Sequence, residues 1–101
     1  MNNEAVIQLG RTVSVQRVGA HVALVTLQRP QVRNAIDAIT ALNLEQAVQL
    51  TDADHDVRCV ILTGAGDQAF CAGADLKAIA NGEAAALSTT RGGFAGFVHQ
   101  P

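Results

Sequence analysis

The sequence predicts an α/β fold, and three features of its 101 residues indicate that class. Two short segments, residues 13–17 and 21–27, are rich in β-branched residues and have the length of strands. Residues 34–54 change to the three- and four-residue apolar period of an amphipathic helix. Residues 57–64 then form a short, continuously apolar run that is typical of a buried strand. The predicted order is strand, strand, helix, strand.

The first two strands are predicted to form a β-hairpin. Val13, Val15 and the residues up to Arg17 alternate apolar with polar, and Gly19 follows where the chain must turn. The second strand, residues 21–27, is expected to end before Pro30, because proline has no N–H to donate to a neighbouring strand.

Residues 34–54 are predicted to form one amphipathic helix with Asp37 as its N-cap. Three aspartates, at positions 52, 54 and 56, close this helix. They lack the glycine and the terminal glutamate of a calcium-binding EF-hand loop, so the prediction is a solvated turn. The apolar stripe of the helix consists of Ala41, Leu44, Val48 and Thr51, widened by Ile39, Leu42 and Leu50.

Two further helical segments are predicted after the third strand. Residues 76–80 are expected to form a helical turn with Asp75 as its N-cap. Beyond Gly92 and Gly93, a helix is predicted from Phe94 to His99, ending near Pro101.

The composition argues against several classes of function. Apolar residues make up 49% of the chain and charged residues 16%, which is typical of a protein with a packed core. The net charge is −2 and the seven lysines and arginines are scattered, so nucleic-acid binding is not expected. No apolar run approaches the roughly 18 residues of a membrane span, and the N-terminus lacks the pattern of a signal peptide. We expect a soluble, cytoplasmic protein without a membrane partner.

The cysteines and histidines do not suggest metal chemistry. Cys59 and Cys71 lie in apolar segments and are predicted to be buried, reduced thiols. His21, His55 and His99 are far apart in the sequence and lack ligand spacing, so no metal site is expected.

The glycine-rich segment 64–79 allows two functional interpretations, of which a dinucleotide-binding loop is the first. Residues 64–69 match the pattern G-x-G-x-x-A, and the acidic Glu83 lies further along the chain. However, Gly73 would fall inside the helix that this motif requires, at a cost of about 1 kcal/mol relative to alanine. A Rossmann unit also has this loop after its first strand, whereas here a hairpin and a helix come earlier.

The second interpretation is a backbone oxyanion site in residues 70–77. Gly73 permits backbone conformations that other residues resist, and Ala74 has little side chain to block approach to its N–H. With Asp75 capping a helix, the N–H groups near Ala74 would lie where an oxyanion can be stabilised. An ordinary glycine turn followed by a capping aspartate is the structural alternative, and the residues alone leave it open.

Three blocks together resemble the crotonase (enoyl-CoA hydratase/isomerase) superfamily. They are R-P-x-x-x-N-A at 29–35, V-x-x-V-I-L-T-G-A-G at 57–66 and F-C-A-G-A-D-L at 70–76. The resemblance covers residues 13–101, and the stretch after the third block is weakly similar to carnitinyl-CoA dehydratases. It implies that residues 1–101 are the N-terminal part of one crotonase-like domain, a spiral of ββα units. The implied elements are a hairpin, an amphipathic helix, a buried strand, an oxyanion loop and a helix, which are incomplete as a fold without the C-terminal part.

The resemblance also implies a substrate and the residues that bind it. Members of the superfamily bind acyl-coenzyme A thioesters and hold the thioester oxygen between two backbone N–H groups, the first of which corresponds to Ala74. Coenzyme A enters as part of the substrate, so no separate cofactor is implied. The side chains of Arg33 and Lys77 are either contacts for the ligand's phosphates or solvent-exposed charges. The residues expected to contact coenzyme A are Gln31, Val32, Arg33, Ala72, Gly73, Ala74, Asp75, Leu76 and Lys77.

The second oxyanion donor and the catalytic carboxylates of the superfamily correspond to no residue of this chain. Glu4, Glu45 and Glu83 cannot be assembled into a paired general acid and base. The implied activity is therefore reversible hydration of 2-enoyl-CoA by a full-length enzyme of fatty acid metabolism, as a homotrimer or hexamer. This chain would supply the acyl-CoA-binding half and be inactive alone. The alternative is a non-catalytic acyl-CoA-binding fragment or module.

Overall fold

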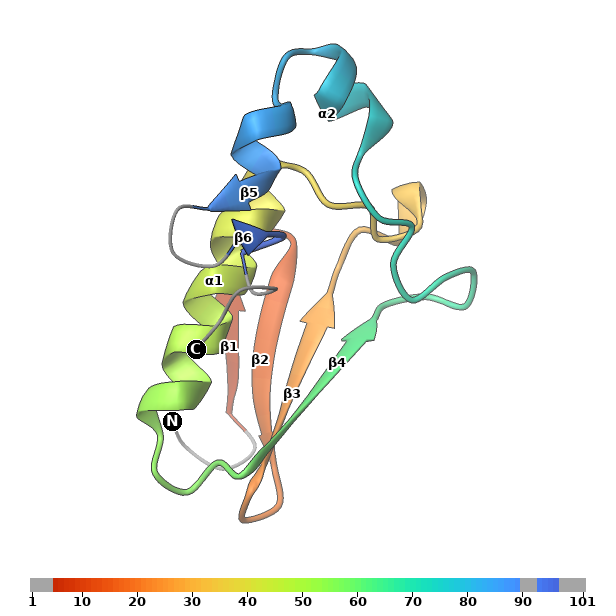
Figure 1. Ribbon diagram of the computed structural model, residues 1–101. Helices are drawn as coiled ribbons and strands as arrows, with labels where there is room; N and C mark the ends of the chain where they lie inside the picture. The colour runs from red at the N-terminus through yellow and green to blue at the C-terminus, as the bar shows by residue number, and fades with distance from the viewer. Residues whose placement is uncertain (1–4, 90–92, 97–101) are drawn as a thin grey trace.

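A four-stranded sheet carrying one long helix forms the body of the computed structural model, which describes residues 5–89 and 93–96 (Figure 1). Strands β1 (Val6–Leu9), β2 (Val13–Val18) and β3 (Val22–Leu27) are successively antiparallel. Strand β4 (Cys59–Gly64) pairs with β3 in parallel, and helix α1 (Ala38–Ala53) connects the two in sequence. The predicted α/β class and the order of these elements are confirmed.

The predicted hairpin is present as β2 and β3, whose register pairs Val18 with Val22 across the turn. Strand β1 was not predicted from the sequence. It has only four residues at one edge of the sheet, and its side chains alternate between exposed and half-buried positions. A strand so short gives little periodicity to detect.

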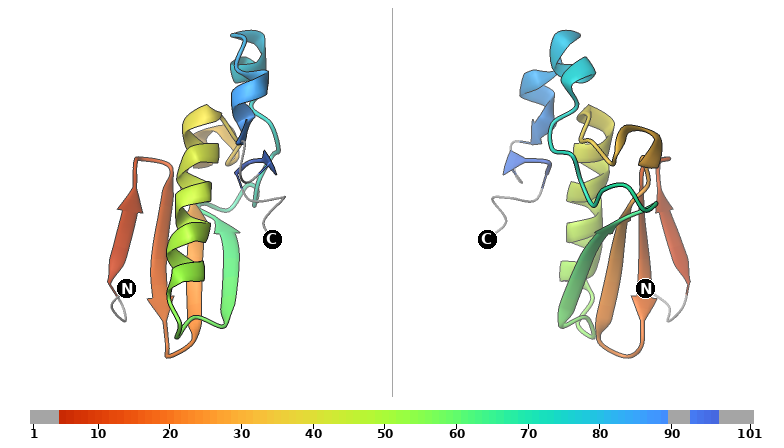
Figure 2. Two further views of the ribbon diagram at one scale, coloured as in Figure 1. Left: turned by 60° about the vertical axis from the view of Figure 1, so that its left-hand side comes forward. Right: turned by 90° about the vertical axis from the view of Figure 1, so that its right-hand side faces the viewer.

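Helix α1 lies across one face of the sheet (Figure 2). It begins as predicted at Asp37, whose carboxylate accepts a hydrogen bond from the Thr40 N–H at 2.9 Å. Its buried residues Ala41, Leu44 and Ala47 pack in one hydrophobic core with residues of β2 and β3: Val13, Val15, Val25 and Leu27.

The predicted width of the apolar stripe on α1 is wrong. Ile39, Leu42 and Leu50 are 58%, 50% and 38% exposed, whereas Leu44 is 1% exposed. A helix packed on a single sheet buries only the stripe that faces the sheet. These three residues lie outside that stripe, and no described element covers them.

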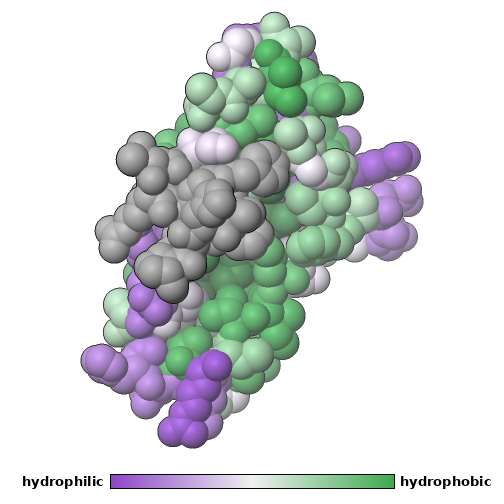
Figure 3. Space-filling model, in the orientation of Figure 1, coloured by the Kyte–Doolittle hydropathy of each residue, from purple (hydrophilic) through white to green (hydrophobic). Residues whose placement is uncertain are grey.

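Strand β4 is less buried than predicted. Val60 and Ile61 are 45% and 49% exposed, and Cys59 is also exposed, because β4 is an edge strand among the described residues. Figure 3 shows hydrophobic residues gathered over this part of the sheet, beside α1. The prediction of two buried thiols is therefore wrong for Cys59, while Cys71 is half-buried; both are free cysteines.

The parallel pairing of β3 and β4 determines where the functional loops meet. Parallel strands have their carboxyl ends at the same edge of the sheet, so the segments after Leu27 and after Gly64 leave the sheet side by side. The first segment leads into the short 3-10 helix η1 (Pro30–Val32), and the second leads to helix α2 (Leu76–Ala80). Both segments carry blocks of the crotonase resemblance.

The last described elements are the 3-10 helix η2 (Ala84–Leu87) and a small sheet of β5 (Ser88–Thr89) and β6 (Gly93–Phe94). The helix predicted from Phe94 is wrong where the structure describes it. Phe94 is in β6, and Ala95 and Gly96 have left-handed φ angles of 56° and 81°, which a right-handed helix cannot contain. The rest of that predicted helix, including His99, lies outside the described residues. In the described parts of the chain, no helix has the length and apolar character needed to cross a membrane.

We expect truncation of two leucines on α1 to have unequal effects on stability. Leu44→Ala removes a buried side chain from the core and should lower the free energy of unfolding by about 2–5 kcal/mol. Leu42→Ala makes the same chemical change at a 50% exposed position and should change that free energy by no more than about 0.5 kcal/mol. Urea denaturation of both variants measures the difference. Equal losses would show that the face of α1 has been assigned wrongly.

Candidate functional site

Two loop segments lie side by side at the carboxyl ends of β3 and β4. The N–H of Ala72 donates to the Arg33 carbonyl at 3.0 Å, and the N–H of Ile36 donates to the Gly73 carbonyl at 2.7 Å. The N–H of Asp75 then donates to the Ile36 carbonyl at 2.8 Å. The last two of these bonds make an isolated parallel bridge between Ile36 and Ala74, and the first joins the two segments just before that bridge. The three bonds together are called the ladder below.

The ladder orients the backbone N–H of Ala74. In extended backbone, successive residues direct their polar groups to opposite sides. Because the Gly73 carbonyl and the Asp75 N–H both face Ile36, the N–H of Ala74 faces away from it. Within residues 5–89 and 93–96, no atom accepts a hydrogen bond from this N–H. Ala74 is half-buried, so the structure presents an oriented donor without a protein acceptor in the part of the chain that it describes.

Gly73 has the special backbone conformation predicted for it, with a φ of +89°. A Cβ atom at this position would meet no atom within 4 Å, so the left-handed conformation alone favours glycine. The N–H of Gly73 donates to the Cys71 sulfur at 3.4 Å. The φ angle of Gly73 and this hydrogen bond define the backbone conformation immediately before Ala74.

Asp75 caps α2 as predicted. One oxygen of its carboxylate accepts from the N–H groups of Lys77 and Ala78 at 2.9 and 3.1 Å. The Ala78 hydrogen bond contributes most to lowering the pKa of Asp75, and the bonds from Arg29 and from the Lys77 N–H lower it further, while burial acts in the opposite direction. The carboxylate is therefore held in its charged form.

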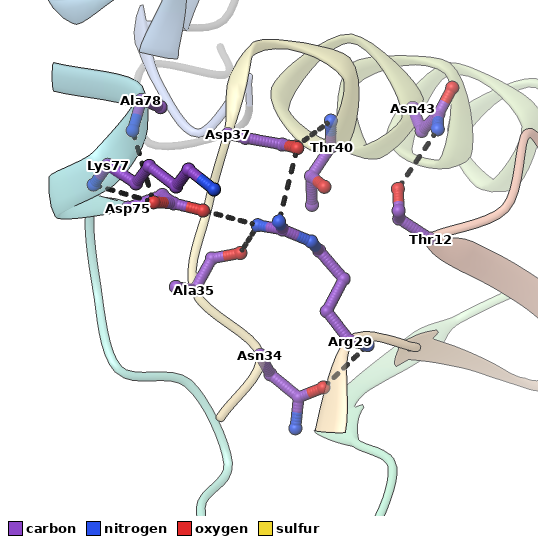
Figure 4. Close-up of polar contacts among 10 residues, drawn as sticks. All are labelled: Thr12, Arg29, Asn34, Ala35, Asp37, Thr40, Asn43, Asp75, Lys77 and Ala78. Atoms are coloured by element: carbon purple, nitrogen blue, oxygen red, sulfur yellow. Dashed lines mark hydrogen bonds and ion pairs between the residues drawn. The ribbon is translucent and has the colours of Figure 1, made fainter. Parts of the chain in front are cut away.

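Arg29 joins the two loop segments through its guanidinium (Figure 4). Its Nη1 donates to the Ala35 carbonyl at 2.6 Å and to Asp75 Oδ2 at 3.0 Å. Its Nη2 lies 3.4 Å from Asp37 Oδ2. The three side chains are 14%, 13% and 24% exposed, so these charges are largely shielded from solvent. One arginine thus contacts the N-cap residues of both α1 and α2.

The side chain of Asn34, in the turn after η1, also connects the two loop segments. It is 1% exposed; its side-chain oxygen accepts from the Arg29 N–H, and its amide nitrogen donates to the Ala65 and Ala69 carbonyls, all at 2.9 Å. Asn34 also has a left-handed φ of 58°, which asparagine adopts more readily than most residues. The turn that follows β4 is therefore held by one buried side chain.

The structure brings some of the predicted site residues together and leaves others apart. The backbone of Arg33 contacts the 72–75 segment, while its side chain is exposed. Gln31 and Val32 are exposed on η1, and no hydrogen bond within the described chain connects them to residues 72–77. Ala72 and Lys77 are exposed, and Leu76 is 79% exposed. Of the two predicted binding segments, both within the described residues, only the parts at the ladder are hydrogen-bonded to each other.

Two residues of the site, Arg29 and Asn34, were not predicted as functional from the sequence. Both belong to the R-P-x-x-x-N-A block, which was the signal that could have identified them. Their partners lie up to 46 positions away in the chain, and no local pattern reveals such contacts.

The described residues do not support the alternative chemistries. Residues 65–68 form bends, and between the end of β4 and Leu76 no helix begins. A dinucleotide fingerprint requires a helix that opens directly after its glycines. Within the described ranges, no cluster of three or more His, Cys, Asp or Glu side chains could hold a metal ion. Glu45 lies on α1 and Glu83 precedes η2, while Glu4 lies outside the described residues.

The lowered pKa of Asp75 predicts a pH-dependent contribution to stability. A folded-state pKa below the unfolded-state value stabilises the fold above the unfolded pKa, and this stabilisation is lost as pH falls through the folded pKa. Between about pH 5 and about pH 2, Asp75→Asn should therefore flatten the decline in the free energy of unfolding. Urea titrations at several pH values measure the slope. Asp67→Asn, at an exposed position, is the matched control, and an equal flattening there would contradict the assignment to Asp75.

Comparisons with known proteins agree with this fold. Residues 17–97 match the family model for enoyl-CoA hydratase/isomerase. YngF of Bacillus subtilis, provisionally named an enoyl-CoA hydratase/isomerase, is 54% identical over 57 residues, which are 56% of this chain and 22% of YngF. The carnitinyl-CoA dehydratase of Proteus mirabilis is 46% identical over 72 residues, or 71% of this chain and 27% of that protein.

A crystal structure of carnitinyl-CoA hydratase from Mycobacterium avium matches with a TM-score of 0.76 and 43% identity. The match covers 88% of this chain and 34% of that structure. The alignments to these two curated relatives thus cover about a quarter of each, and the fold corresponds to the N-terminal part of crotonase-fold structures. By sequence and by fold, the chain belongs to the enoyl-CoA hydratase/isomerase family.

Proposed function

We propose that this chain forms the acyl-CoA-binding part of an enzyme that reversibly hydrates 2-enoyl-CoA thioesters. The observation that carries this proposal is the N–H of Ala74, which is oriented by the ladder and meets no acceptor among the described residues. In the proposed reaction this N–H donates to the thioester oxygen of the substrate. Family membership supports the reaction class, and the two curated relatives above carry the names of a hydratase/isomerase, given provisionally, and a dehydratase.

A fixed N–H suits this chemistry because charge develops on the thioester oxygen. Water adds its hydroxyl to C3 of the enoyl group, the electron pair of the double bond moves toward the thioester as an enolate, and C2 then takes a proton. A donor that is already oriented stabilises the enolate oxygen without reorganising during the reaction. Loss of one such donor costs about 2.7–4 kcal/mol of transition-state stabilisation.

The two loop segments offer both apolar and cationic side chains to an acyl-CoA. Leu76 and Val32 are 79% and 39% exposed, so they present apolar surface on the two loop segments. Arg33 and Lys77 are exposed cations on the same segments and would meet the phosphates of coenzyme A. Coenzyme A arrives as part of the substrate in this proposal, with no separate cofactor.

The remaining catalytic groups would come from a longer polypeptide. Asp37 and Asp75 have both carboxylate oxygens engaged by cap and Arg29 contacts, so they are poor candidates for proton transfer. We therefore propose that residues 1–101 are part of one domain whose other part supplies the second oxyanion donor and the acid and base. We further propose that the complete enzyme works in the cytoplasm as a homotrimer or hexamer. Binding of acyl-CoA without turnover is the second candidate function of the chain alone, favoured by the occupied carboxylates.

Ala74→Pro, made in the full-length enzyme, tests the oxyanion role directly. Proline removes the N–H, so kcat for crotonyl-CoA hydration should fall by about 10²–10³-fold. Ala74→Gly keeps the N–H and is the matched control, which should retain turnover. Circular dichroism establishes that the folds are intact. Full turnover by correctly folded Ala74→Pro would sink the assignment.

The chain of 101 residues is expected to bind acyl-CoA without hydrating it. Isothermal titration calorimetry with crotonyl-CoA measures binding, and the loss of enoyl absorbance measures turnover. The preparation must be shown by intact mass to contain no longer species. Hydration by this chain alone would contradict the proposal that its acid and base lie elsewhere.

A further inference from the structure

Arg29 occupies the junction between the two loop segments of the candidate site. It lies two residues after the end of β3, and its guanidinium contacts three acceptors: the Ala35 carbonyl, the Asp37 carboxylate and the Asp75 carboxylate. A planar guanidinium offers several donors in a rigid fork, so it can hold such partners in one fixed arrangement. In the folded chain these partners belong to two segments that are far apart in sequence.

Each aspartate divides its two oxygens between its helix and Arg29. Asp37 uses Oδ1 to accept from the Thr40 N–H and Oδ2 to contact Arg29. Asp75 uses Oδ1 to accept from N–H groups at the start of α2 and Oδ2 to accept from Arg29. The guanidinium consequently fixes the start of α1 relative to the start of α2.

Ala74 lies one position before the aspartate that Arg29 holds. Its bridge partner, Ile36, lies one position before Asp37, so Arg29 closes the ladder immediately beyond the Ile36–Ala74 bridge. With the ladder closed at this end, the N–H of Ala74 has a fixed position and direction. Without Arg29, each of the two carboxylates would lose the ion pair that it makes with this guanidinium.

We propose that Arg29 is a positioning residue for catalysis, which sets the place of the Ala74 N–H by joining the N-cap residues of α1 and α2. This inference rests on the oxyanion role proposed above for Ala74. It assigns to Arg29 an effect on the transition state, where the N–H of Ala74 would act, in addition to its effect on stability. A displacement of about 1 Å in such a group can reduce turnover by about 10²-fold.

The test compares Arg29→Gln with Arg17→Gln in the full-length enzyme. Arg17 is the matched control because it too is largely shielded from solvent and ion-paired, but at the opposite end of α1, where it lies 3.1 Å from Asp54. Arg29→Gln should lower kcat for crotonyl-CoA by about 10²-fold and change KM much less, since only the position of the donor has moved. Arg17→Gln should leave kcat unchanged at a temperature well below the unfolding midpoint of either variant.

A double-mutant cycle identifies the contact through which Arg29 acts. Asp75→Asn keeps a good helix cap but removes the charge that Arg29 contacts. If both residues act through one contact, Arg29→Gln with Asp75→Asn should lose no more kcat than the worse single variant. Arg29→Lys keeps the charge without the planar fork, so its kcat should lie between those of the parent and Arg29→Gln. If Arg29→Gln does not fold, the kcat values of Asp75→Asn and Arg29→Lys still test the positioning role.

The outcomes separate this inference from the proposed function. If Ala74→Pro lowers kcat as expected while Arg29→Gln and Arg29→Lys keep the parent kcat, the positioning role is wrong and the oxyanion role stands. If Ala74→Pro keeps turnover, the oxyanion role fails, and the positioning role fails with it. Equal losses of kcat in Arg17→Gln and Arg29→Gln would reduce Arg29 to a stabilising residue and overturn the inference.

Discussion

The contact of one guanidinium with two capping carboxylates is the interaction on which the loop arrangement depends. Arg29, Asp37 and Asp75 are mostly shielded from water, and a charge in that setting must have a partner of opposite sign. Each member of the group makes the burial of the others tolerable. Removal of one leaves an uncompensated buried charge, which is far more costly than loss of an exposed pair. The bridge between Ile36 and Ala74 lies one position before the two carboxylates of this group.

Helix α1 is held to the sheet by arginines at both of its ends. Arg29 follows β3 and contacts the N-cap Asp37, while Arg17 in β2 contacts the C-cap Asp54. The pKa of Asp54 is lowered chiefly by a hydrogen bond from the Asp56 N–H, and Arg17 lowers it further. The core between these ends is apolar, so the two ion pairs add charged contacts at either end of the helix.

The sequence predicted those parts of the fold that depend on local patterns. The hairpin, the start of α1 at Asp37 and the cap of α2 at Asp75 all follow from residues within a few positions of one another. The ladder, the Arg29 contacts and the Asn34 contacts join segments that are distant in the sequence, so the periodicity of the sequence cannot predict them. The wrong predictions share a cause as well. The exposure of Leu42 and Ile61 depends on which elements cover them, which the sequence does not state. The left-handed backbone conformation at Ala95 is unusual for alanine, so the alanine-rich sequence predicted a helix there instead.

The parallel pairing of β3 with β4 also has a kinetic consequence. Val18 and Val22 meet across a tight turn, whereas Val22 and Cys59 meet only after the whole of α1 has been traversed in sequence. Pairings between distant residues form more slowly than local ones, because the chain must first close a long loop. The segments that form the candidate site emerge beyond this pairing. The site therefore has no local precursor, and we expect it to be among the last parts of the chain to become ordered during folding.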